Sequence, residues 1–409
     1  MPRRLPARSQ ARARSDAEAA TRLAAAQPDS PGAKQRPRRQ RRTWILAVLG
    51  GVALLLLIVL FGWLVAESPA RLRSRAEAAT RAGDWTTALR YWRAINATQA
   101  ARGVTQVEET RACLALGRAA QAEHSLHQAI TADPTDPEPW RLLLEILRVE
   151  DRTLEALHMG WEAYDRVHPE ARPVLLRELT LSLLTDLPDE LVRTTLRRWV
   201  EADGADVNAR IALLQRIGVQ PRAADPDRAS LLAALEALLV EHPDHIGSRE
   251  VLVTALADAG ESQRGRALLD DWPEPARDAR YWRLRGRWDL EYDHQPERAA
   301  VAFKTALEEF PQDWRSWYRL ARTLRILGRD VEGRQAAENV SRIREVLDPL
   351  VLGPRLDGAF NHLDDPVALR DLAALCDRAG LTRLADAWRA LAEITRQYQS
   401  RTTVARPTP

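Results

Sequence analysis

The chain has 409 residues, of which 45% are hydrophobic, 29% charged and 6% aromatic. This composition excludes a wholly disordered chain, and the length is enough for several core-forming units. The formal net charge is +3, but residues 1–42 contain twelve Lys or Arg against three acids, a balance of +9 that leaves −6 for residues 43–409. The basic character of the chain therefore belongs to its N-terminal tail.

Residues 1–42 are rich in Arg, Pro, Ser, Gln and Ala and have no apolar periodicity, which predicts a disordered basic tail. Residues 43–66 follow without a single charged side chain. As a helix this segment is about 36 Å long, which is enough to cross a hydrocarbon core of about 30 Å. We therefore expect one transmembrane helix at residues 43–66.

The charges around this segment predict its orientation. Six Lys or Arg lie shortly before it and four shortly after it, a bias that places the N-terminus in the cytoplasm. A cleaved signal peptide is the alternative, because Leu64-Val65-Ala66 fits a cleavage site, but the long leader and long apolar run favour an anchor. We expect a single-pass inner (plasma) membrane protein with residues 67–409 outside the cytoplasm.

After the membrane segment, Gly-containing and Pro-containing turns alternate between helical patterns with a period of about 34 residues. In a unit that starts at Pro137, Trp140, Leu143, Ala156 and Ala163 take positions 4, 7, 20 and 27. Later units repeat this spacing with Ala299, Phe303, Ala306 and Pro311; with Trp317, Leu320, Ala321, Leu324 and Gly328; and with Leu369, Leu372, Ala373, Gly380 and Ala385.

These positions resemble the signature of the tetratricopeptide repeat (TPR) family, and the chain resembles a membrane-anchored bacterial TPR protein. The resemblance implies an all-α fold: a right-handed α-solenoid of about nine TPR-like helix pairs. The transmembrane helix expected from residues 43–66 precedes it. The predicted parts are a solenoid at 67–347, a hinge or break at 348–364, a last helix pair that caps the array at 365–396, and a disordered tail at 397–409. Contacts in such an array join adjacent repeats. Cys113 and Cys376 should therefore be unpaired, buried thiols.

The sequence contains no nucleotide-binding loop, nucleophile elbow or zinc-protease motif, and its two cysteines lack the spacing of a zinc site. His124 and His127, beside Glu123, are the best catalytic-looking candidates, but their repeat positions predict a solvated outer surface. We expect no enzymatic activity, no cofactor and no metal site.

In TPR arrays, positions 2, 5, 9 and 12 of each first helix line a concave groove. Ten arginines take such positions here: Arg111, Arg141, Arg148, Arg280, Arg283, Arg287, Arg315, Arg322, Arg325 and Arg370. Four acids share these positions: Glu138, Glu145, Glu250 and Asp377. Guanidinium groups bind carboxylates through paired hydrogen bonds, so the groove is predicted to bind an acidic protein or peptide. The candidate partner-binding residues are Arg141, Arg148, Arg283, Arg287, Arg315, Tyr318, Arg322 and Arg325.

These patterns favour a membrane-anchored protein-interaction scaffold that assists the assembly of an envelope complex. One alternative is a solenoid that belongs to, or assists, an enzyme acting on envelope substrates. The other is a helical-repeat nucleic-acid binder, which the arginine content suggests. The membrane segment and the net charge of −6 after residue 42 count against nucleic acid as a partner.

Overall fold

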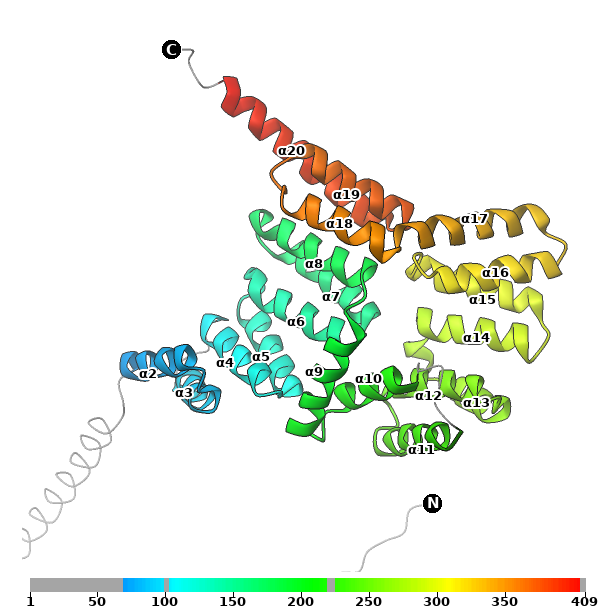
Figure 1. The fold of residues 1–409 in the computed structure, drawn as a ribbon, viewed down its shortest axis with the longest axis horizontal. Coiled ribbons are helices and arrows are strands. Elements are labelled where there is room, and N and C mark those ends of the chain that lie inside the picture. Colours follow the sequence, from blue (N-terminus) through cyan, green and yellow to red (C-terminus); the bar gives the residue numbers. More distant parts are fainter. Residues whose placement is uncertain (1–68, 99–102, 219–224, 405–409) are drawn as a thin grey trace, which may run out of the picture. The chain divides into compact units, whose positions relative to one another are not determined.

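The computed structural model describes residues 69–98, 103–218 and 225–404 (Figure 1). These residues form 19 α-helices and two short 3-10 helices, and no strand occurs among them. The prediction of an all-α chain is confirmed for this part. No helix among the described residues is long and apolar enough to cross a membrane. The predicted tail at 1–42 and the predicted span at 43–66 lie outside the described residues.

Nine helices form the first half of the described chain. They are α2 (Pro69–Ala82), α3 (Trp85–Thr98), α4 (Gly103–Ala115), α5 (Ala119–Ala132), α6 (Pro137–Val149), α7 (Thr153–Arg166), α8 (Arg172–Leu184), α9 (Asp189–Ala202) and α10 (Val207–Gly218). The remaining ten are α11 (Asp225–Glu241), α12 (Ile246–Asp258), α13 (Ser262–Asp270), α14 (Ala279–Glu291), α15 (Pro296–Glu309), α16 (Trp314–Ile326), α17 (Asp330–Val346), α18 (Pro349–Phe360), α19 (Pro366–Arg378) and α20 (Thr382–Val404).

Consecutive helices pack as pairs. The closest pairs are α2 with α3, α4 with α5, α14 with α15, α16 with α17, and α19 with α20. Neighbouring pairs stack through contacts such as α3 with α4, α5 with α6, and α15 with α16. The regular pairing changes in the middle of the chain, where α8 packs on both α6 and α7, and α9 packs on α10. Stacked helix pairs of the predicted kind are therefore present, and the right-handed sense of their stacking stays a prediction.

The first helix of several pairs begins in the same way. Asp136, Asp313 and Asp365 each accept a hydrogen bond at their side chain from the backbone N–H two residues later, at 2.8–3.0 Å. Such an N-cap satisfies a backbone donor that the helix leaves free. Trp140 and Trp317 then donate their indole N–H to a proline carbonyl six residues earlier, at 3.1 and 2.8 Å. Two units far apart in the sequence thus share one local geometry, which agrees with the repeat phase.

Glycine allows a tight turn within a pair and the close approach of neighbouring helices. Gly117 ends α4 with φ of +77°, and a Cβ there would lie 2.9 Å from the carbonyl oxygen of Arg198. Gly286 in α14 faces Phe303 of α15, whose ring atoms would lie 2.8 Å from an added Cβ. Any larger side chain at these two positions would therefore push helices apart.

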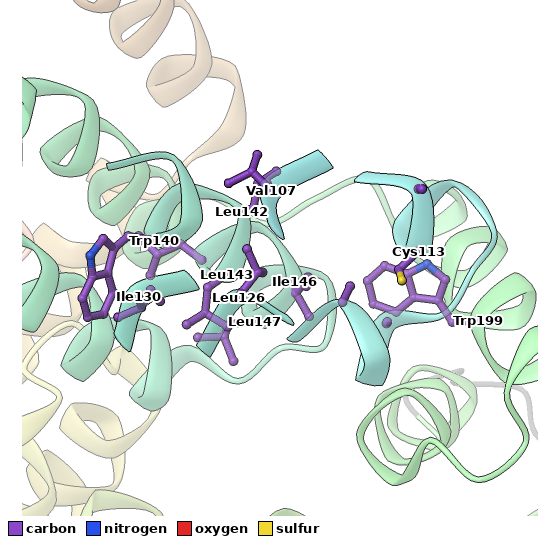
Figure 2. Packing of buried hydrophobic residues seen from close by; sticks show 14 of the residues in the cluster. Val107, Cys113, Leu126, Ile130, Trp140, Leu142, Leu143, Ile146, Leu147 and Trp199 are labelled. Carbon is purple, nitrogen blue, oxygen red and sulfur yellow. The ribbon is translucent and has the colours of Figure 1, made fainter. Parts of the chain in front are cut away.

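The residues that carry the repeat signature form the core. Trp140, Ala156, Ala163, Phe303 and Ala306 have at most 3% of their surface exposed. Figure 2 shows part of the N-terminal core, in which side chains of α4, α5, α6 and α9 pack together. The prediction of two unpaired, buried thiols is also confirmed, because Cys113 and Cys376 are fully buried and free.

The last helices pack against the first half of the chain. Trp161 of α7 and Leu179 of α8 share one apolar cluster with Leu372 of α19 and Trp388 of α20, and α8 lies beside α20 (Figure 1). Trp388 donates its indole N–H to the hydroxyl oxygen of Thr180 at 3.0 Å, across a separation of 208 residues. The expectation that contacts join only adjacent repeats is therefore wrong here. The helices next to α7 and α8 in the sequence cover only part of their apolar surface, and the last helices cover another part.

The segment predicted as a hinge or break, 348–364, contains a single helix instead of a pair. Asp348 caps α18, Pro349 occupies its first turn, and Pro354 lies inside it. The buried side chains Leu352 and Leu356 attach this helix to the cluster around Trp388. At the C-terminus, α20 extends to Val404, eight residues beyond the predicted end of the last pair at 396. A helix thus occupies residues 397–404, which were predicted to be disordered.

Replacing Trp388 by Ala tests how much the contact with α8 stabilises the array. The change removes a fully buried indole and leaves the hydroxyl of Thr180 without this donor. We expect the free energy of unfolding to fall by about 3–5 kcal/mol, the usual cost of truncating a buried Trp. Removing residues 365–409 should have a larger effect, since it uncovers α8 and α17 together. Urea denaturation followed by circular dichroism measures both changes.

Ile394→Ala is the matched control, because Ile394 lies on the same helix but is 63% exposed. Its free energy of unfolding should change by less than about 0.5 kcal/mol. Equal effects of Trp388→Ala and Ile394→Ala would contradict a stabilising contact between α8 and α20.

Candidate functional site

Helix α16 combines one buried face with one exposed basic face. Asp313 caps its first turn, and Leu320, Ala321 and Leu324 bury the inner face against neighbouring helices. Its sequence, WRSWYRLARTLRI, contains four arginines and no carboxylate. The array around it is acidic: residues 68–409 have a net charge of −5, because residues 43–409 have −6 and Glu67 contributes one of those charges. α16 is therefore a local basic surface on an acidic array.

Four predicted site residues lie on the exposed face of α16: Arg315, Tyr318, Arg322 and Arg325. Among the described residues, no carboxylate lies within ion-pair distance of these three guanidinium groups. The contacts of their side chains are a cation–π contact from Arg315 to Trp314 at 4.7 Å and a hydrogen bond from the Nε of Arg325 to the carbonyl oxygen of Ala321 at 3.3 Å. We call Arg315, Tyr318, Arg322, Arg325 and the exposed Ile326 the α16 face.

The predicted arginines of α14 are engaged within the chain. Arg283 pairs with Glu250, while Arg287 contacts Asp258 at 2.9 Å and Glu291 at 3.0 Å. Burial raises the pKa of Glu250, and Arg283 opposes that shift. A ligand that takes Arg283 would therefore leave a carboxylate poorly solvated and without its partner. The two residues stabilise the stack of α12 and α14, and they offer little to a partner.

The two predicted arginines of α6 are also engaged. Arg141 contacts Glu138 at 2.9 Å and Glu145 at 3.5 Å. Arg148 donates to the hydroxyl of Thr185 at 2.6 Å, and burial lowers its pKa. The candidate residues therefore do not form one uniformly available groove.

Arg370, another predicted groove position, lines an open hollow of about 410 Å³ between α19 and α20. Small side chains, Ala373 and Ala392, form part of its lining, and Arg389 beside them pairs with Asp377. Arginines and acids alternate around this hollow, so its charge is more balanced than that of the α16 face.

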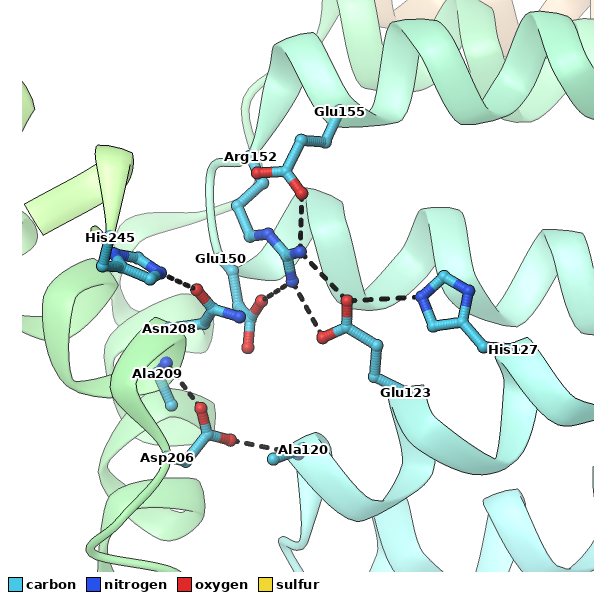
Figure 3. A network of polar contacts seen from close by, with 10 residues as sticks. All are labelled: Ala120, Glu123, His127, Glu150, Arg152, Glu155, Asp206, Asn208, Ala209 and His245. Carbon is cyan, nitrogen blue, oxygen red and sulfur yellow. Dashed lines mark hydrogen bonds and ion pairs between the residues drawn. The ribbon is translucent and has the colours of Figure 1, made fainter. Parts of the chain in front are cut away.

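A buried polar network, which the sequence did not predict, joins α5, α6, α7 and α10 (Figure 3). At its centre the guanidinium of Arg152 contacts Glu123 at 2.9 Å, Glu150 at 2.8 Å and Glu155 at 2.6 Å. Nearby, Asp206 accepts hydrogen bonds from the backbone N–H groups at the starts of α5 and α10, both at 3.1 Å. The network thus connects helix pairs that are distant in sequence.

One positive charge cannot neutralise three carboxylates in this network. The side chain of Glu150 is only 1% exposed, and burial raises its pKa to about 8 despite the nearby Arg152. Burial also opposes ionisation of Glu123, but hydrogen bonds from His127 and Arg152 outweigh it and lower the pKa of Glu123 to about 2. Glu150 is therefore the member that holds a proton near neutral pH.

His124 and His127 have different neighbours. His127 lies 3.8 Å from Glu123, whereas His124 contacts the side chain of Gln128 at 2.9 Å. Both rings are exposed, as predicted for a solvated outer surface. Within the described ranges, no group of three or more His, Cys, Asp or Glu side chains is arranged to hold a metal ion.

Sequence reasoning placed Glu250 at a groove position but missed its pairing with Arg283, and it also missed the other acids that pair with α14 and a residue that extends the basic surface. Glu291 lies four residues after Arg287 on one helix face, a spacing that predicts an ion pair. Arg344 of α17 lies 5.2 Å from the ring centre of Trp314, opposite the start of α16. No short-range pattern in the sequence brings Arg344 to this helix.

No protein-family model and no curated protein matches the sequence. Solved structures that are similar include a tetratricopeptide repeat protein from Parabacteroides merdae, with 16% identity, 63% of this chain and 98% of that chain covered, and a TM-score of 0.30. The Cut9-Hcn1 hetero-tetramer of APC/C has 13% identity, 82% and 81% coverage, and a TM-score of 0.33. Yeast Tom70 has 11% identity, 80% and 76% coverage, and a TM-score of 0.30. These low values assign no partner or activity to the chain.

The protonated Glu150 predicts a dependence of stability on pH. Its pKa is raised from 4.5 to about 8 in the folded chain, so the folded state keeps a proton that the unfolded state releases. The stabilisation is complete below about pH 4.5 and is lost as the pH rises through about 8. Between about pH 6.5 and 9, the free energy of unfolding should fall by roughly 2 kcal/mol. Urea denaturation at a series of pH values measures this slope.

Glu150→Gln should remove most of this slope, because the amide carries no charge at any of these pH values. The matched control is Glu162→Gln, which removes a carboxylate from an exposed ion pair with Arg166 on α7. The control should keep the slope of the wild type. A Glu150→Gln variant with an unchanged slope would show that another group titrates.

Proposed function

We propose that this protein is a membrane-anchored interaction scaffold whose array of helix pairs binds an acidic protein or peptide through the α16 face. Residues 43–66 anchor the chain in the inner membrane, the N-terminus lies in the cytoplasm, and the array lies outside it. In this position the protein assists the assembly of an envelope complex. The observation that carries the proposal is the set of three arginines on α16 without a carboxylate partner among the described residues.

The contrast with the other candidate arginines supports the choice of this face. Arg141, Arg283 and Arg287 already contact carboxylates, so a ligand gains from them only by breaking an existing pair. Arg315, Arg322 and Arg325 have no carboxylate partner among the described residues, so a ligand carboxylate breaks no ion pair when it binds them. Charge-assisted guanidinium–carboxylate hydrogen bonds are among the stronger polar contacts. An acidic ligand is therefore favoured at α16 over the rest of the predicted groove.

The net charge of −5 on residues 68–409 supports a local acidic ligand rather than a long polyanion. Nucleic acid binding depends on many phosphate contacts and would meet repulsion from most of this array. An enzymatic role for the solenoid has no comparable observation in its favour. Protein binding is accordingly the function that we propose.

Replacing Arg315, Arg322 and Arg325 by Glu should abolish binding of an acidic ligand, because each change turns an attraction into a repulsion. With the full-length chain in nonionic detergent and a fluorescent polyglutamate peptide, we expect affinity to fall at least tenfold. Binding by the wild type should also weaken as salt increases, since the contacts are solvent-exposed. Fluorescence anisotropy measures both effects.

The matched control replaces Arg334, Arg342 and Arg355 by Glu, which makes the same charge change at exposed positions on α17 and α18. This variant should keep most of the affinity, and both variants should melt as the wild type does. Wild-type affinity in the α16 variant, or an equal loss in both variants, would show that the α16 face is not the binding surface.

The proposed topology is tested by reporter fusions. A reporter that is active only outside the cytoplasm should work when it is fused after Pro409, and it should be inactive when fused at the N-terminus. The physical reason is the excess of Lys and Arg before residues 43–66, which resists export. The reverse pattern of activity would contradict the proposed orientation.

A further inference from the structure

The α16 face has a regular geometry that restricts the shape of its ligand. At 3.6 residues per turn, Arg315, Tyr318, Arg322 and Ile326 fall within about 80° of the helix circumference. Tyr318 is 55% exposed and Ile326 is 57% exposed, so apolar surface accompanies the charges. Arg325 flanks the same side as Tyr318. The face is therefore a basic stripe with an apolar border.

The spacing of Arg315 and Arg322 sets a length along the helix. Seven residues at 1.5 Å each separate their Cα atoms by about 10 Å along the axis. A peptide in the polyproline II conformation has three residues per turn and rises about 3.1 Å per residue, so side chains at i and i+3 point the same way about 9 Å apart. In a β-strand, side chains on one side are about 7 or 13 Å apart. The polyproline II spacing matches the two arginines best.

A helical ligand could also place two carboxylates about 10 Å apart, if its acids were seven residues apart. It would also have to form two helical turns, and isolated helices shorter than about 12 residues are marginal in water. Polyproline II is a major conformer of unfolded chains, so a short disordered segment reaches the required geometry with little ordering. The two residues between the acids then point to the flanks, and Tyr318 lies on one flank.

We propose that the α16 face binds an internal polyproline II segment of a partner protein, in which two carboxylates are three residues apart and an apolar residue lies between them. The carboxylates contact Arg315 and Arg322, and the apolar side chain covers Tyr318. This inference rests on the proposed function and adds the spacing and conformation of the ligand.

Three fluorescent peptides of identical composition test the spacing with the full-length chain in nonionic detergent. The probe Gly-Glu-Leu-Pro-Glu-Gly has its acids three residues apart. The comparison peptides Gly-Glu-Glu-Leu-Pro-Gly and Gly-Glu-Leu-Glu-Pro-Gly have acids one and two residues apart. We expect the first peptide to bind about fivefold more tightly, because only its second carboxylate reaches the second arginine. The variant with Glu at 315, 322 and 325 should bind none of them, and the variant changed at Arg334, Arg342 and Arg355 should bind all three as the wild type does.

The outcomes separate the two proposals. Equal binding of the three peptides, lost in the α16 variant, would overturn the spacing and leave the acidic binding face in place. Absence of binding by every peptide, or binding that the α16 variant retains, would overturn both.

The apolar contact has a test of its own. Tyr318→Ala should weaken binding of the first peptide about threefold, and should have little effect on a peptide in which Ser replaces Leu. Equal effects on the two peptides would show that Tyr318 does not contact the apolar residue. Arg322→Gln should weaken both peptides alike, because it removes a contact with a carboxylate that both contain.

Discussion

The burial of α7 and α8 against the last helices of the described chain is the constraint on which the other contacts depend. A helix pair cannot bury its apolar surface alone, and in this chain Trp388 of α20 covers Thr180 of α8, while Leu179 joins the apolar cluster that α7, α8, α19 and α20 share. The hydroxyl of Thr180 accepts from Trp388 and donates to the carbonyl oxygen of Leu176 at 2.7 Å. Both buried polar groups are thereby satisfied, so an apolar contact with a specific polar pair holds α20 on α8.

Short-range signals predicted the helices well. The small residues Ala156 and Ala163 act within one helix pair, so their spacing in the sequence is also their spacing in the structure. The contact of Trp388 with Thr180 spans 208 residues and leaves no periodic trace. Pro354 is a short-range signal that misleads, because proline usually ends a helix. It lies inside α18, where burial of the nearby leucines offsets the cost of a proline in the helix.

The site was predicted in part, for the same reason. Counting positions identified arginines on first helices, and Arg315, Arg322 and Arg325 are exposed as that count requires. The count could not show which arginines are occupied, because Glu250 reaches Arg283 from another helix, 33 residues away. Glu150 was missed because its carboxylate is buried near Glu123 and Asp206 only after several pairs have packed, although Arg152 is close in the sequence.

Whether an arginine is already paired with a carboxylate decides how much binding free energy a ligand gains from it. Removing Arg283 from Glu250 would leave a poorly solvated carboxylate unpaired, which costs about 1–3 kcal/mol and cancels much of the gain from a new contact. Arg322 has no such partner among the described residues, so a ligand carboxylate replaces only water there. The same residue type at equivalent repeat positions therefore stabilises the stack on α14 and remains available for binding on α16. Selectivity among equivalent arginines arises from the acids around them rather than from the arginines themselves.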